Sequence, residues 1–250
     1  MIDAHAHLWL SRPEQCRKYI LQAAEQFGIS QVYVSTLDGD EMKPNEEIIE
    51  ACNQATADFM KDYPGLIRGY VYINPQNTNA MDVMRRGMEE QGMSGVKLWV
   101  SCLCDDPSVY PLAESLIEYG KPLLIHAFYK ATGQYSGEST CLHVRNLAKR
   151  YPELKIIMAH LGGEAYHGIR AIRDCENVWV DHSGTLVGSN DLAHAVRLLG
   201  TNRILFGSDM SVGGFEPSYG QMLEVAVSEK QREDMLWRNA KMLFEGGALR

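Results

Sequence analysis

Residues 2–8 read Ile-Asp-Ala-His-Ala-His-Leu, and this stretch decides which architecture the rest of the chain favours. On a β-strand, His5 and His7 would lie two positions apart with both rings on one face. Because neutral imidazole is the commonest protein ligand for transition metals, two convergent rings at a strand end indicate the start of a metal site. An isolated His-x-His pair is more often two surface histidines, so the interpretation depends on the other strands.

Seven further strand-like runs follow, separated by stretches with helical periodicity or strong helix formers. The eight runs are IDAHAHL from Ile2, ISQVYVSTL from Ile29, LIRGYVYI from Leu66, SGVKLWV from Ser94, KPLLIHAF from Lys121, LKIIMAH from Leu154, NVWVDHS from Asn177 and NRILFGSD from Asn202. Predicted helices include residues 13–27, 46–62, 80–91, 111–119, 140–150 and 191–199. One or two closing helices are expected over 229–245, with Leu236, Trp237, Leu243 and Phe244 available to pack on the strands.

Alternation of strand and helix is typical of βαβ units, whose right-handed crossovers keep the strands parallel. Eight such units close a (β/α)8 TIM barrel, and the 250 residues match the usual length of that fold. The rival is an open doubly wound sheet, which normally carries a Gly-rich phosphate turn after its first strand. Here the first strand ends in histidines instead. With no low-complexity linker, residues 1–250 are predicted to form a single barrel domain.

Composition narrows the classes of function. A hydrophobic content of 45% can supply one substantial core, and the net charge of −8 without a Lys/Arg-rich run argues against a nucleic-acid partner. No signal-like or bilayer-length apolar segment is evident, so we expect no membrane partner and a cytoplasmic protein. Six scattered cysteines indicate free thiols. The pair Cys102 and Cys104 could contact a metal, but two small buried residues are the more common case.

In a TIM barrel the active site gathers at the carboxyl ends of the strands. Six polar residues end, or nearly end, five of the predicted runs, where a core side chain would otherwise be expected. They are His5, His7, Lys97, His126, His160 and Asp209. Such joint placement favours a metal site, and mixed imidazole and carboxylate ligands suit Zn²⁺, Mn²⁺ or Fe²⁺ better than Mg²⁺.

Several longer motifs resemble the amidohydrolase superfamily, and within it the amidohydrolase-2 branch, which includes metal-dependent decarboxylases of aromatic and unsaturated acids. The resemblance covers nearly the whole chain. It rests on DAHAHLW at Asp3, GVKLW at Gly95, PLLIHA at Pro122, AHLGG at Ala159, DHSG at Asp181, ILFGSD at Ile204 and WRNAKMLF at Trp237.

This resemblance implies one divalent metal, with zinc expected and manganese or iron as alternatives. Its implied ligands are His5, His7, His126 and Asp209, and the implied proton-transfer residue is His160. Asp209 could also take a proton from metal-bound water, so it is a catalytic candidate together with His160. Since relatives are often dimers, a homodimer is an expectation as well.

Lys97 leaves three alternatives open. In some superfamily members a lysine on the fourth strand is carboxylated and bridges two metals, whereas this branch usually has one metal and an unmodified residue. An unmodified lysine would either neutralise carboxylates or contact the substrate. Further substrate-binding candidates are Trp9, Trp99, Phe128 and Tyr129, and a loop over residues 129–140 could cover the substrate. His182, near the end of the seventh strand, is a candidate for contacting the metal ligands rather than the metal itself.

The leading hypothesis from the sequence is a metal-dependent hydrolase that acts on a small carbonyl-containing metabolite, such as an amide, lactone or ester, through a metal-activated water. The first alternative keeps the fold and the metal but makes the reaction non-oxidative decarboxylation of an aromatic or unsaturated acid. The second alternative is a metal-binding barrel without catalysis.

Overall fold

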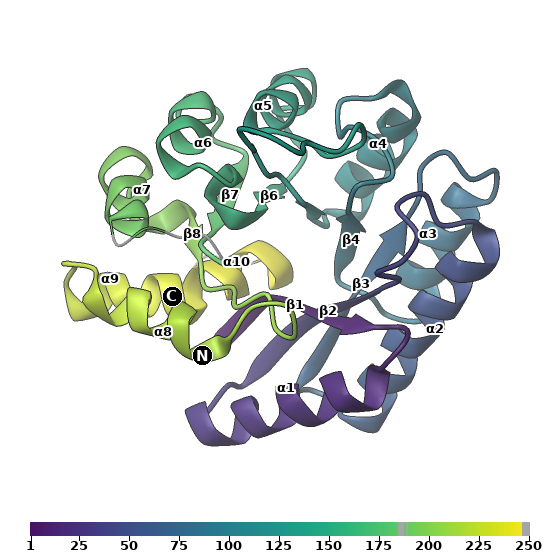
Figure 1. Cartoon of the computed structure of the whole chain (residues 1–250), viewed down its shortest axis with the longest axis horizontal. Helices are drawn as coiled ribbons and strands as arrows, with labels where there is room; N and C mark the ends of the chain where they lie inside the picture. Colours follow the sequence, from purple (N-terminus) through teal and green to yellow (C-terminus); the bar gives the residue numbers. More distant parts are fainter. Residues whose placement is uncertain (185–187, 189, 247–250) are drawn as a thin grey trace.

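The computed structural model describes residues 1–184, 188 and 190–246. Within them, eight strands form one parallel sheet in the order β1 to β8, and helices alternate with the strands around it (Figure 1). The strands are β1 (Ile2–Trp9), β2 (Gln31–Leu37), β3 (Ile67–Ile73), β4 (Gly95–Leu98), β5 (Leu123–Ile125), β6 (Ile156–Met158), β7 (Val178–Asp181) and β8 (Ile204–Leu205). The predicted TIM barrel is confirmed. The predicted domain of residues 1–250 reaches positions 247–250, which lie outside the described residues.

Helices cover the outside of the barrel and follow the strands in turn. They are α1 (Pro13–Phe27), α2 (Glu46–Asp62), α3 (Ala80–Glu89), α4 (Tyr110–Tyr119), α5 (Cys141–Arg150), α6 (Ala165–Ala171), α7 (Asp191–Leu199), α8 (Phe215–Glu224), α9 (Glu229–Glu233) and α10 (Asn239–Glu245). Among the described helices, none combines the length and apolar character that a bilayer span needs.

Hydrogen bonds between β1 and the segment that follows β8 bring the two ends of the sheet together. The N–H of Ala4 donates to the carbonyl of Phe206 at 2.9 Å, and the N–H of Asp209 donates to the carbonyl of His5 at 2.8 Å. The barrel is therefore nearly closed, and the residue after β8 that the sequence singled out lies beside the first histidine of β1.

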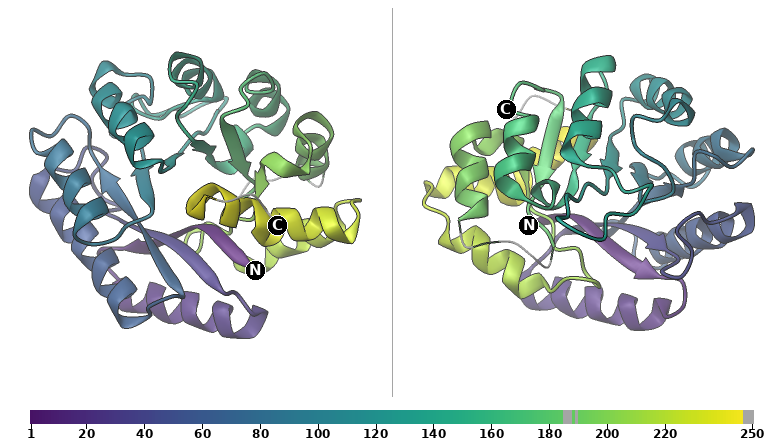
Figure 2. Two further views of the ribbon diagram at one scale, coloured as in Figure 1. Left: turned by 180° about the vertical axis from the view of Figure 1, so that it is seen from behind. Right: turned by 45° about the horizontal axis from the view of Figure 1, so that its top comes forward.

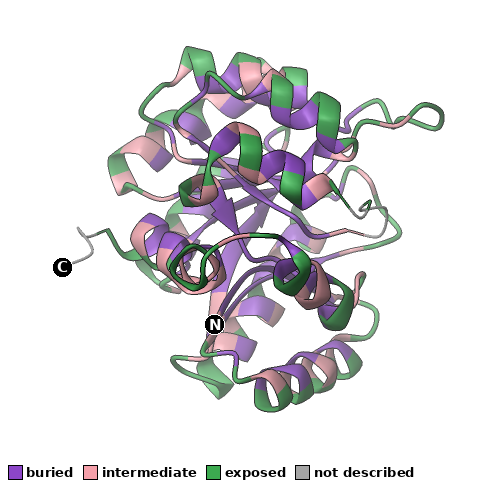
Figure 3. Ribbon diagram, turned by 90° about the vertical axis from the view of Figure 1, so that its left-hand side faces the viewer, coloured by how far each residue is buried: buried purple, intermediate pink, exposed green. Residues whose placement is uncertain are grey.

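Strand residues alternate between two cores, as a period of two requires. On β6, Ile156 and Met158 pack outward under the helices, whereas Ile157 points into the barrel with Tyr33 and Leu124. Figure 3 shows the strands as mostly buried, while the helices expose one face to solvent. A polar residue at an inward position near a strand end therefore points into the barrel mouth.

The C-terminal segment closes the barrel at the end where the strands begin. After α9, a π-helical turn (Asp234–Arg238) leads into α10, which places Leu243 and Phe244 in the inner core. Phe244 stacks on Tyr33 with 3.8 Å between ring centroids. Figure 2 shows these C-terminal helices lying against the strands. The predicted closing helices over 229–245 thus match the structure.

Replacing Phe244 by alanine is expected to lower the free energy of unfolding by about 3–5 kcal/mol, because a buried aromatic ring is lost and a cavity remains. Urea unfolding measures the change. The control is Leu142→Ala on α5, whose side chain is 55% exposed and should cost less than about 0.5 kcal/mol. Equal effects of the two substitutions would show that α10 is not part of the core.

Candidate metal centre and active site

Three of the predicted residues converge at the barrel mouth. The Nε2 atoms of His5 and His7 lie 2.9 Å apart, and Asp209 Oδ1 lies 3.3 Å from His7 Nε2 and 3.7 Å from His5 Nε2. All three side chains are buried, and one ligand atom from each falls within 4.8 Å of the others. The backbone of Asp209 has a left-handed φ of 57°. Such strained conformations often mark functional sites.

The hydrogen-bond partners of Nδ1 in His5 and His7 determine which ring nitrogen carries the proton. His7 Nδ1 lies 3.2 Å from the carbonyl oxygen of Ser35 and 2.9 Å from its hydroxyl, and a carbonyl can only accept. His5 Nδ1 lies 3.0 Å from the carboxylate of Asp181. Both Nδ1 atoms are therefore donors, which leaves a lone pair on each Nε2.

Two lone pairs and the Asp209 carboxylate thus face one another in a buried space. Burial lowers the pKa of His7 well below its usual value, so this imidazole is neutral and able to ligate. A divalent cation would compensate the convergence of three electron-rich groups, so the residues fit a metal ion.

Lys97 lies beneath these three residues on β4. Its Nζ is 3.1 Å from His5 Nε2, and the side chain is fully buried. Burial lowers the pKa of Lys97 to about 8, an effect that the carboxylates of Asp209 and Asp181 oppose. This burial and the two carboxylates favour charge balance over direct substrate contact as the role of Lys97, which stays a prediction.

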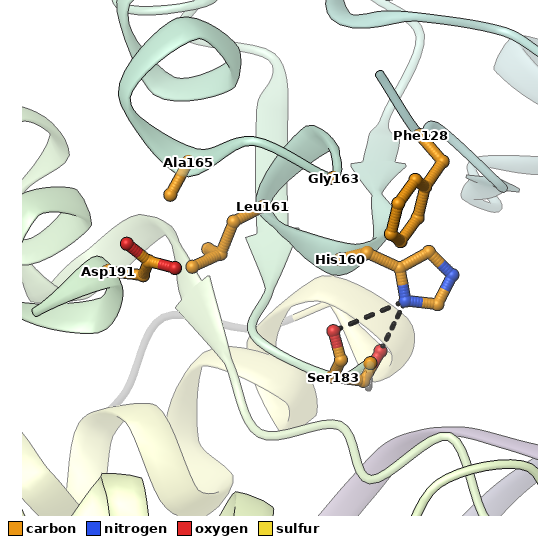
Figure 4. Close-up of a pocket in the computed structure, with 8 residues that line it drawn as sticks. Phe128, His160, Leu161, Gly163, Ala165, Ser183 and Asp191 are labelled. Atoms are coloured by element: carbon orange, nitrogen blue, oxygen red, sulfur yellow. Dashed lines mark hydrogen bonds between the residues drawn. The ribbon is translucent and has the colours of Figure 1, made fainter. Parts of the chain in front are cut away.

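His160 lies just past the end of β6, with its ring held from behind. Its Nδ1 is 3.0 Å from the hydroxyl and 3.3 Å from the carbonyl oxygen of Ser183 (Figure 4). His160 and Leu161 have left-handed φ values of 60° and 49°, and each such residue costs about 1–2 kcal/mol. A cavity of about 10 Å³ behind the ring has room for roughly one water molecule.

His126 contacts His160 instead of joining the His5, His7 and Asp209 group. Its Nδ1 lies 3.1 Å from His160 Nε2, and its Nε2 lies 3.0 Å from Glu138 Oε1. Glu138 is itself buried and pairs with Lys130 at 2.7 Å. The role of His126 as a metal ligand therefore stays a prediction. Glu138, which the sequence analysis did not identify, fixes the loop after β5 to the site.

A cavity of about 190 Å³ opens over these groups. Its lining residues are His7, Trp9, Leu37, Trp99, Val100, His126, Lys130, Tyr135, Glu138, His160, Asp209 and Val212. Among the predicted substrate contacts, Trp9 and Trp99 both line this cavity, with 6.2 Å between ring centroids. Phe128 instead lines the small cavity behind His160. Tyr129 is 45% exposed and stacks on His167, outside both cavities.

Comparison with known proteins places this site in a family. The family model described as amidohydrolase (Amidohydro_2) matches residues 2–246. The chain belongs to the amidohydrolase-2 family. A curated relative is 2-amino-3-carboxymuconate-6-semialdehyde decarboxylase from Dictyostelium discoideum, which is 26% identical over 244 residues, covering 79% of this chain and 67% of that protein.

Two solved structures share the fold of this chain at low sequence identity. One is a dihydroxybenzoic acid decarboxylase from a Polaromonas species with bound manganese and the inhibitor 2-nitroresorcinol, with a TM-score of 0.79, 17% identity and coverage of 98% of this chain and 96% of that one. The other is 4-oxalomesaconate hydratase from Rhodopseudomonas palustris, with a TM-score of 0.72, 15% identity and coverage of 98% and 95%.

One expectation about a polar residue needs correction. His182 follows β7, but its ring packs against Phe206 in the outer core, with 5.5 Å between ring centroids, and does not support the ligands. The residue before it, Asp181, contacts the candidate ligand His5 instead.

The six cysteines are free and buried, as expected. Burial raises the pKa of Cys102 to about 11, and no group of potential metal ligands among the described residues includes Cys102 or Cys104.

Gly207 leaves room for the pair of His5 and Asp181. A Cβ atom at this position would lie 3.0 Å from the Cβ of Asp181 and 3.1 Å from the Cβ of His5. We expect Gly207→Ala to cost about 1–3 kcal/mol of stability through overpacking and to weaken metal binding. Thermal unfolding and metal titration measure the two effects.

Gly220 on α8 provides the matched control, because a Cβ there meets nothing within 4 Å. Gly220→Ala should leave metal binding unchanged and keep or raise stability, since alanine is the better helix former. If Gly207→Ala behaved like this control, the close approach to His5 would not be required.

Proposed function

We propose that this protein is a metal-dependent, non-oxidative decarboxylase of a small aromatic or unsaturated acid. The observation that carries the proposal is the cavity, which is lined by the indole rings of Trp9 and Trp99 and by the polar side chains of His7, His160 and Asp209. The leading expectation from the sequence was hydrolysis, which would use the same metal ligands. The decarboxylase named as a curated relative favours the alternative.

The shape and chemistry of the cavity suit a planar acid. Flat indole faces pack well against a conjugated ring or chain, and polar side chains in the same cavity can contact a carboxylate. The volume of about 190 Å³ favours a small ligand.

We infer one divalent ion at His5, His7 and Asp209, with His126 as the fourth ligand that the family resemblance implies. When bound, the ion would polarise a substrate oxygen and stabilise negative charge on it. Zinc remains the expected metal, and manganese is the alternative because the dihydroxybenzoic acid decarboxylase holds it. Lys97 contributes a buried positive charge beneath the same groups.

Decarboxylation adds one proton to the carbon that bears the carboxylate. The bond between that carbon and the carboxylate then breaks, and its electron pair returns to the conjugated system as CO₂ leaves. His160 is the proposed proton donor, since its Nε2 is on the side of His126 and its ring lines the cavity. The oxygen atoms of Ser183 at Nδ1 would stabilise the ring in its protonated form.

The test is a panel of hydroxybenzoates and unsaturated dicarboxylates, incubated with protein reconstituted with Zn²⁺ or Mn²⁺ and assayed for CO₂. A parallel panel of esters, lactones and amides is assayed for hydrolysis. Release of CO₂ from at least one acid is the expected result. Hydrolysis without CO₂ would replace this proposal by the hydrolase hypothesis. Metal binding with neither reaction would favour the non-catalytic barrel.

A further inference from the structure

Asp181 is a fully buried carboxylate at the end of β7 that connects three strand ends. Its Oδ2 lies 3.0 Å from His5 Nδ1 on β1. Its Oδ1 accepts from the backbone N–H of His160 at 3.1 Å, from the backbone N–H of Ser183 at 3.1 Å and from the hydroxyl of Ser183 at 2.5 Å. One side chain therefore contacts a candidate metal ligand, the candidate proton donor and the serine behind that donor.

We propose that Asp181 is a positioning residue that holds His5 in the tautomer with its lone pair on Nε2 and, through Ser183, keeps a proton on His160 Nδ1. The proposal rests on the metal site described under the proposed function. It does not depend on which reaction the site performs.

The direction of each hydrogen bond supports this assignment. An ionised carboxylate can only accept, so His5 Nδ1 must carry the proton that faces Asp181. The Ser183 hydroxyl has a single proton, and its short contact with Asp181 takes it. The oxygen of Ser183 is then left to accept from His160 Nδ1 at 3.0 Å. Both rings consequently carry a proton on Nδ1, and His160 Nε2 on the cavity side stays available for proton transfer.

Asp181 also holds the backbone that aims His160. The left-handed turn at His160 and Leu161 places the ring against His126, and the N–H of His160 within that turn donates to Asp181. An unpaired N–H at this buried position would be costly, so the carboxylate stabilises the strained turn.

Asparagine at position 181 keeps the size of the side chain but reverses one hydrogen bond. The two backbone N–H groups favour the amide oxygen on their side, so the amide NH₂ turns toward His5 Nδ1. His5 would then accept at Nδ1 and carry its proton on Nε2, where it blocks metal binding. The same logic makes an aspartate-to-asparagine change next to a catalytic histidine damaging in serine proteases.

The experiment uses metal-free protein labelled with ¹⁵N-histidine, and two-bond ¹H–¹⁵N correlation spectra report the tautomer of each ring. We expect His5 to carry its proton on Nδ1 in the wild type and on Nε2 in Asp181→Asn. Competition with a chromophoric chelator should show that the variant binds Zn²⁺ about 10–100-fold more weakly. Neither readout requires turnover, so a failed decarboxylase proposal would leave this test intact.

Ser183→Ala is the matched control, because it removes the hydroxyl that lies 3.0 Å from His160 Nδ1 and 3.2 Å from His5 Nδ1 but keeps the Asp181 carboxylate at His5. It should bind Zn²⁺ like the wild type, keep the His5 tautomer and lower kcat with little change in KM. Wild-type affinity and an unchanged His5 tautomer in Asp181→Asn would overturn the proposal. If that variant does not fold, the wild-type spectrum still decides, since a His5 proton on Nε2 would contradict the assignment.

Discussion

Asp209→Asn is expected to abolish metal binding and turnover together. The substitution keeps the shape of the side chain but removes the negative charge that faces the lone pairs of His5 and His7. An amide oxygen is a weaker ligand than a carboxylate, and loss of a ligand should exceed the roughly 10–100-fold effect of losing a residue that only supports one. Elemental analysis after dialysis and a CO₂ assay measure the two losses.

Asp174→Asn controls for a general effect of removing an acidic charge. Asp174 pairs with Arg145 and Lys149 on the outer surface, where exposed ion pairs contribute little. This control should retain full metal content and activity. Wild-type metal content in Asp209→Asn would remove Asp209 from the ligand set.

His160→Asn is expected to keep the metal and lower kcat by about 10²–10⁴-fold, the usual contribution of a general acid or base. The asparagine side chain can still contact Ser183, so the surrounding structure should persist. An asparagine side chain cannot, however, supply a transferable proton at the position of His160 Nε2. Single-turnover kinetics with the metal-loaded variant measure the effect.

His194 gives the matched histidine control, because it is also buried but packs against Tyr166 with 4.2 Å between ring centroids. His194→Asn should change neither metal content nor kcat. Equal turnover by His160→Asn and the wild type would exclude His160 from proton transfer.

Most of the fold could be predicted because the strands are buried apolar runs at regular spacing. The predicted bounds of α1, α2 and α7 agree with the structure. Helices α6 and α8 were not predicted from the sequence. Helix α6 contains Gly168, and α8 contains Pro217 and Gly220, which are residues of weak helix propensity. Packing against the barrel stabilises these helices, and local sequence cannot report that contribution.

The site could be predicted in part. His5, His7, His160 and Asp209 stand out because each interrupts an apolar run near a strand end. Asp181 was missed, although alternation along β7 carries the signal. Trp179 packs in the inner core and Val180 in the outer core, so Asp181 must face inward and His182 outward.

Glu138 illustrates what the sequence could not provide. It lies in an irregular loop where no periodicity indicates direction, and only the three-dimensional structure places it against His126. The tautomers of His5 and His160 are likewise invisible in sequence, because their partners lie more than 20 positions away along the chain.

The most direct test of a metal-dependent decarboxylase is a titration of metal-depleted protein. Zn²⁺ or Mn²⁺ is added in steps, and the rate of CO₂ release from the acid that the panel identifies is recorded. Our account predicts a rate that rises linearly and levels off at one equivalent per chain. A break at two equivalents would indicate a binuclear site with carboxylated Lys97, and a rate independent of added metal would contradict the proposed mechanism.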